Sequence, residues 1–141
     1  MARRESDLWE SIRNAVSGHW ERVENMLGAG YPDVSFCTSD GIEGHMELKQ
    51  LRAWPKRTRT KINPRVSDDQ IKWGALRTRA GGLWLLGVGT PDRDILLFTG
   101  MPAVRVADKQ FTRAQMYDAA AWHGPVSMIE TGIQQLVEEQ K

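Results

Sequence analysis

Cysteine is almost absent from this chain, which has one, Cys37, among its 141 residues. A single cysteine excludes an intramolecular disulfide and a four-cysteine zinc site, and it fits a reducing, intracellular setting. Long apolar runs are missing as well, because no stretch approaches the roughly 20 residues that cross a bilayer. The first residues are polar and lack the apolar centre of a signal peptide. We therefore expect a cytoplasmic protein with no membrane association.

A strong overall charge is also lacking. Nineteen Lys and Arg residues face 18 Asp and Glu residues, for a net charge of +1, so the total charge does not indicate a nucleic-acid partner. Hydrophobic residues make up 40% and charged residues 26%, which is ordinary for a globular protein. A chain of this length suits one core, and no internal repeat divides it. We expect a single domain over residues 1–141.

Apolar spacing and turn residues predict the order α, β, β, β, α, β, β, α, α. The expected helices cover about 6–17, 67–79, 112–122 and 126–138, and the expected strands cover 19–25, 33–37, 45–51, 83–88 and 95–99. The strand at 19–25 is favoured over a continued helix because Gly18 interrupts the first one. Strands interleaved with helices predict the α/β class, with a central mixed sheet flanked by helices.

Three residues carry the chemistry that the sequence suggests: Asp33, Glu47 and Lys49. In a strand over 45–51, Glu47 and Lys49 point to the same face, since side chains alternate. Asp33 begins the strand before it, and pairing of the two strands in a hairpin would bring it beside Glu47. Two carboxylates open to water suit Mg²⁺ or Mn²⁺, and a lysine beside them could orient a water and stabilise negative charge.

The spacing by itself does not decide between this site and a solvated strand face. An acidic residue two positions before a lysine also occurs at Glu139-Gln140-Lys141, and a second Pro-Asp pair occurs at Pro91-Asp92. The Glu139–Lys141 triplet has no matching aspartate, and no Glu-x-Lys triplet follows the Pro91-Asp92 pair as one follows Pro32-Asp33. The surrounding sequence therefore has to decide.

The segment Gly30-Tyr31-Pro32-Asp33-Val34, a glycine turn and Met46-Glu47-Leu48-Lys49 together resemble the PD-(D/E)XK nuclease superfamily. The pattern G-x-P-D, hairpin, apolar-E-apolar-K is most similar to the VRR-NUC and Holliday-junction-resolvase branches. The glutamine of the following helix appears as Gln70 after Ser67. The resemblance covers about residues 6–100 and leaves a C-terminal helical extension over about 112–138.

This resemblance implies a restriction-endonuclease-like core, a divalent cation (Mg²⁺ or Mn²⁺) and cleavage of DNA. Asp33 and Glu47 would bind the metal, and Lys49 would position the attacking water. The family also has an acidic residue upstream of the Pro-Asp pair, for which Glu24 is the best match and Glu21 the second. Gln70 would contact the scissile phosphate or a water, or be a surface residue of the first helical turn. The short chain suggests a phage- or virus-encoded enzyme acting in the host cytoplasm.

Positive charge is concentrated between Lys49 and Arg79, where ten basic residues face only Asp68 and Asp69. Such patches supply the phosphate contacts that dominate nucleic-acid affinity. The expected DNA-binding residues are Arg52, Trp54, Lys56, Arg57, Arg59, Lys61, Arg65, Lys72 and Arg77. Trp54 would stack on a base or wedge a junction. A merely solvated loop over 52–66 is the alternative.

Neutralising Arg57, Arg59 and Lys61 should weaken DNA binding and flatten its dependence on salt, because fewer counterions would be released. An unchanged slope of affinity against salt would count against a DNA-binding loop.

Cleavage of branched DNA, such as a Holliday junction, is the function that the resemblance implies. The alternatives are a nicking, restriction-like or repair nuclease on duplex DNA, a nuclease fold that binds DNA without cutting it, and a protein-interaction module. The C-terminal helices either pack on the sheet or form a dimer contact. A two-fold homodimer would suit a symmetric junction, since it presents two opposed sites.

Overall fold

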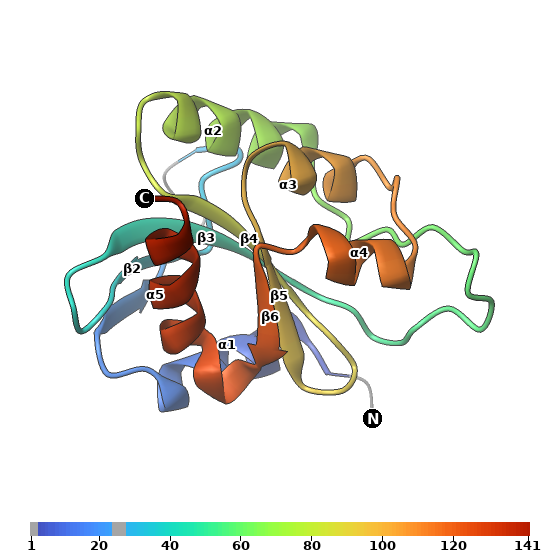
Figure 1. Ribbon diagram of the computed structural model, residues 1–141, viewed down its shortest axis with the longest axis horizontal. Helices are drawn as coiled ribbons and strands as arrows, with labels where there is room; N and C mark the ends of the chain where they lie inside the picture. The colour runs from blue at the N-terminus through green and yellow to red at the C-terminus, as the bar shows by residue number, and fades with distance from the viewer. Residues whose placement is uncertain (1–2, 24–27) are drawn as a thin grey trace.

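The computed structural model describes residues 3–23 and 28–141, and it is built on one mixed sheet (Figure 1). Six strands follow the order β1-β2-β3-β4-β5-β6, which is also their order in the chain. They are β1 (His19–Arg22), β2 (Val34–Cys37), β3 (Glu43–Gln50), β4 (Trp84–Gly89), β5 (Asp94–Phe98) and β6 (Trp122–Pro125). Strands β3 and β4 pair in parallel, and each other pair of neighbours in this order is antiparallel. The predicted α/β class with a mixed sheet is therefore confirmed.

Helices cover both faces of the sheet (Figure 1). On one face lie α1 (Glu5–Ala15) and α5 (Ile129–Glu139), which follows the short 3₁₀ helix η1 (Val126–Met128). On the other lie α2 (Asp68–Arg79), α3 (Gly100–Ala107) and α4 (Arg113–Ala119). Across the described ranges, no helix combines the length and the apolar character needed to cross a membrane.

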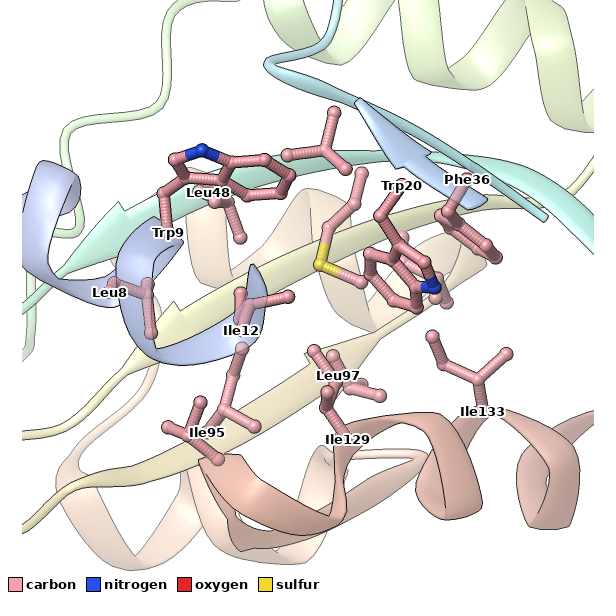
Figure 2. Packing of buried hydrophobic residues seen from close by; sticks show 14 of the residues in the cluster. Leu8, Trp9, Ile12, Trp20, Phe36, Leu48, Ile95, Leu97, Ile129 and Ile133 are labelled. Carbon is pink, nitrogen blue, oxygen red and sulfur yellow. The ribbon is translucent and has the colours of Figure 1, made fainter. Parts of the chain in front are cut away.

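The core between the sheet and the pair α1 and α5 is shown in Figure 2. Leu8 and Ile12 of α1 and Ile129 and Ile133 of α5 are fully buried against the strands. At its edge the ring of Trp20 stacks on Phe36, with 4.7 Å between the ring centroids. Of the two roles considered for the last helix, packing on the sheet is therefore the one observed.

The two central strands behave as their sequences predict. In β3, Met46 and Leu48 enter the core shared with α1 and α5, while Glu47 points to the α2 side. All residues of β4 are buried, as expected of a continuous apolar run covered on both faces. The parallel step from β3 to β4 uses the basic segment 51–67 and then α2 as its crossover.

Two elements differ from the prediction. Gly100–Ala107 forms α3, which the prediction omitted. Pro102 lies in the first turn, where a missing N–H costs nothing, and Ala103 and Val106 are buried. The helix expected over 112–122 ends at Ala119, and Trp122–Pro125 is an edge strand, a place where proline is tolerated.

Candidate active site

Glu47 is the central side chain of the candidate site. It lies on β3 and is only 1% exposed. Its Oε2 atom accepts a hydrogen bond from the Gln70 side-chain nitrogen at 2.9 Å and lies 3.4 Å from the Lys49 Nζ atom. Among the described residues its Oε1 atom has no hydrogen-bond partner. A buried carboxyl oxygen with a free acceptor position is a ready ligand for a cation.

Asp33 lies beside Glu47, as the predicted hairpin requires. Strand β2 pairs with β3 so that Val34 faces Met46, and Asp33 precedes that pair. Its Oδ2 atom accepts a hydrogen bond from the backbone N–H of Leu48 at 2.9 Å, so the carboxylate is fixed over the middle of β3. The backbone of Asp33 is held as well, because its carbonyl accepts from the N–H of Val23 at 2.7 Å.

The loop before Asp33 packs tightly on the start of α2. Gly30 has φ of +81°, a conformation that favours glycine, and a Cβ atom there would overlap the Asp69 carbonyl group. Nothing larger than glycine therefore fits without moving α2. This contact keeps the Pro32-Asp33 pair and the first turn of α2, which carries Gln70, in a fixed relation.

The electrostatics of the site centre on Glu47. Burial is the main cause that raises its pKa, and the neighbouring Asp33 adds to the shift. Lys49 opposes the shift, and the result is a pKa of about 9. Without a bound cation, Glu47 is therefore protonated at neutral pH. A cation between the two carboxylates would take the place of that proton.

Glu5, exposed at the start of α1, is a residue that the sequence reasoning did not single out. Desolvation raises its pKa, and the charges that act on it include those of Lys49, Asp33 and Arg22. It lies three residues before the buried Leu8, on the same side of α1. This spacing is the one feature of the sequence that could have drawn attention to Glu5. To use it, one would also have to know that α1 packs against β3.

The upstream acidic residue expected from the resemblance is not located by the structure. Glu24 lies outside the described residues. Glu21, the second choice, is on β1, where its carboxylate is 2.8 Å from the His19 ring nitrogen and the side chain is 63% exposed. Its only ion pair within the described ranges is this one with His19, and neither Asp33 nor Glu47 contacts it.

The donors present fit a hard divalent cation. Within residues 3–23 and 28–141, no cluster of three or more His, Cys, Asp or Glu residues forms a ready-made metal cage. Mg²⁺ does not require one, because it commonly binds through one or two carboxylates and keeps several waters or substrate phosphates. Asp33 and the unpartnered Oε1 atom of Glu47 supply two such carboxylates.

Part of the predicted DNA-binding set lies next to this site. Arg52, Lys61 and Arg65 line a cleft of about 960 Å³ whose wall also includes Gln50, the residue after Lys49. Lys56, Arg57 and Arg59 are exposed at the far turn of the loop. Figure 1 shows this segment running past α4. The loop is pinned beyond that turn, where Ile62 is buried and its N–H donates to the Phe111 carbonyl at 2.9 Å.

The remaining predicted contacts lie elsewhere. The Trp54 indole nitrogen donates to Asp92 at 2.8 Å, and the Arg113 guanidinium covers the ring at 4.3 Å from its centroid. Stacking of Trp54 on a base stays a prediction. Lys72 is exposed on α2, and Arg77 stacks over Trp73, 4.5 Å from the ring centroid.

Gln70 joins the start of α2 to Glu47. Its Oε1 atom accepts from the Ser67 N–H at 2.9 Å, and the Ser67 hydroxyl accepts from the Gln70 N–H at 3.2 Å, which forms a capping box. Its side-chain nitrogen is left to donate to Glu47. The structure places Gln70 against the Glu47 carboxyl group, a contact that the sequence reasoning did not consider, and its predicted contact with a phosphate or a water stays a prediction.

Replacement of Gln70 can be measured against a matched residue. Gln115 makes the same capping box with Thr112 on α4, without a buried carboxyl partner. We expect Gln70→Ala to lower the free energy of unfolding by about 1–3 kcal/mol more than Gln115→Ala, because it leaves a buried oxygen of Glu47 without its donor. Urea unfolding of both variants measures this, and equal losses would show that the Glu47 bond contributes nothing.

Comparisons with known proteins leave the site to be judged on its own geometry. A scan against protein-family models finds no match, and no curated protein matches the chain. The likeness to PD-(D/E)XK nucleases therefore rests on the residues of the motif and on where they lie.

Proposed function

We propose that this protein is a metal-dependent nuclease with a restriction-endonuclease-like core that hydrolyses phosphodiester bonds in DNA. One observation carries the proposal: Asp33, Glu47, Lys49 and Gln70, which come from three separate segments, converge on one partly buried point of the sheet. A solvated strand face, the alternative that the spacing left open, would not bury Glu47 or point the side chain of Gln70 at it. Perturbed ionisable groups of this kind cluster at functional sites.

Each residue has a role that its position supports. Asp33 and Glu47 would hold a divalent cation, which supplies polarisation of the phosphate and a more acidic water. Lys49, whose side chain is 12% exposed, is held beside Glu47 and can donate to a water or to the developing negative charge. Gln70 orients the Glu47 carboxylate so that its Oε1 atom stays available.

The finer proposal is a preference for branched DNA, and it comes from the resemblance to junction resolvases. The basic loop 52–66 adds support, because its pinned base adjoins the end of β3 while its exposed turn, with Lys56, Arg57 and Arg59, extends away from it. One loop could then contact two arms of a junction. A homodimer belongs to the same proposal.

The test is a cleavage assay on a labelled four-way junction beside its matched linear duplex, with Mg²⁺, Mn²⁺ or EDTA. We expect cutting that requires the divalent cation and is faster on the junction. Equal rates on both substrates would retain the nuclease and remove the preference for branches. Tight binding without any cleavage would instead favour a DNA-binding protein that does not cut.

A further inference from the structure

The cleft beside the candidate site is bounded by basic side chains from four parts of the chain. Arg3 and Arg4 come from the segment that leads into α1, and Arg22 comes from the end of β1. The opposite wall comes from the two ends of the long loop and carries Arg52, Lys61 and Arg65. We call this feature the arginine cleft. Arg3, Arg4 and Arg22 lie outside the basic segment that the sequence pattern singled out.

The charge of the arginine cleft is not balanced by the protein around it. Among the residues that the structure describes, Glu5 is the only acidic one in its lining. Across residues 3–23 and 28–141, none of its six cations forms an ion pair with a carboxylate. A concave surface lined by one sign of charge focuses its field and attracts a ligand of the opposite sign. Because the whole chain has a net charge of only +1, the positive charge of the cleft does not merely reflect a basic protein.

Two residues of the arginine cleft are fixed by the rest of the protein, Arg65 through its backbone and Arg3 through its side chain. Arg65 has φ of +64°, a conformation that residues other than glycine seldom adopt, and its N–H donates to the Asn63 side chain at 2.9 Å. Arg3 donates to the Ser11 hydroxyl at 2.7 Å, which ties the N-terminal wall to α1. Strained backbone of the kind seen at Arg65 is typical of ligand-binding positions.

The arginine cleft adjoins the end of β3, the strand that carries Glu47 and Lys49. Gln50 lines it and follows Lys49 on β3, and Glu5 lines it while its carboxyl group responds to the charges of Lys49 and Asp33. A polyanion lying in the cleft would therefore run past the end of β3 that carries Lys49. An isolated small anion would not need a track with charges on both walls.

We propose that the arginine cleft binds the phosphate backbone of the DNA strand that is cut, with Arg3 and Arg4 clamping it against Arg52 and Arg65. This inference rests on the proposed function for the identity of the strand. The clamp itself is a binding property, and it can be measured without cleavage. The N-terminal arginines thereby become substrate-binding residues.

The test measures binding of a fluorescein-labelled DNA oligonucleotide, single-stranded and duplex, by the full chain in EDTA over 50–200 mM salt. Two variants are compared with the wild-type protein. One carries both Arg3→Gln and Arg4→Gln, and the other carries Arg65→Gln on the opposite wall. The control Arg105→Gln, Lys109→Gln removes the same charge as the double variant from the exposed surface at the end of α3. Thermal unfolding midpoints verify that each variant folds.

We expect the negative slope of log affinity against log salt to become less steep. For each cleft arginine that is replaced, its magnitude should decrease by about 0.7 with single-stranded DNA and by about 0.9 with duplex DNA. The control should keep the wild-type slope. Equal changes in the control and the Arg3, Arg4 variant would overturn the proposal, as would a wild-type protein that binds no DNA at 50 mM salt. If the cleft variants lose binding while the wild-type protein cuts nothing, the clamp stands and the nuclease proposal fails.

Discussion

Replacing Asp33 by asparagine should lower the rate of DNA cleavage by roughly a thousandfold, because a divalent cation at such a site contributes several kcal/mol to catalysis. Asparagine keeps the shape of the side chain and an oxygen that can accept from the Leu48 N–H. The fold should therefore survive the change. Single-turnover cleavage of a labelled oligonucleotide with saturating Mg²⁺ measures the effect.

The matched control for this change is Asp118→Asn, which removes one carboxylate from the exposed surface of α4. It should leave cleavage unchanged. Asp33→Asn should also bind DNA as tightly as the wild-type protein or more tightly, since it removes negative charge near the phosphate. An Asp33→Asn protein that cuts at the wild-type rate would remove Asp33 from the site.

In EDTA, the free energy of unfolding should fall as pH rises from about 5 to about 9. Glu47 has a pKa of about 9 in the folded protein against an ordinary value of 4.5, so between these values the folded state binds a proton that the unfolded state has released. The contribution of Glu47 to the free energy of unfolding is then greatest below pH 4.5. It is lost at about 1.4 kcal/mol per pH unit as pH rises toward 9.

Urea unfolding at several pH values measures this slope, and Glu47→Gln should remove it because the amide does not titrate. Glu43→Gln, an exposed position on the same strand, should keep the wild-type slope. If the wild-type protein and Glu47→Gln show the same pH dependence, the Glu47 carboxyl is ionised in the folded protein and our account of the site's electrostatics is wrong. Divalent cations should raise stability most at high pH, where they compete with fewer protons.

The main side chains of the candidate site could be placed from the sequence because local rules govern their positions. Alternation along β3 puts Glu47 and Lys49 on one face, and pairing with β2 brings Asp33 beside them. The capping residue Ser67 fixes where α2 begins, and so where Gln70 lies. None of these inferences requires knowledge of how distant segments pack.

Glu5 and the arginine cleft could not be placed in this way. Their positions depend on how α1 crosses β3 and on where the ends of the long loop are anchored. The anchors include the buried Ile62 and its hydrogen bond to the Phe111 carbonyl, a contact between segments about 50 residues apart. Such contacts have no signature in local spacing. The charge count over 49–79 found one wall of the cleft and missed the other.

The most direct test of the central claim is a titration of the protein with Mn²⁺, in which paramagnetic resonance counts bound ions while DNA cleavage is recorded in the same samples. We expect cleavage to rise together with Mn²⁺ binding and Asp33→Asn to lose both. Cleavage without a divalent cation, or undiminished Mn²⁺ binding by Asp33→Asn, would contradict this expectation.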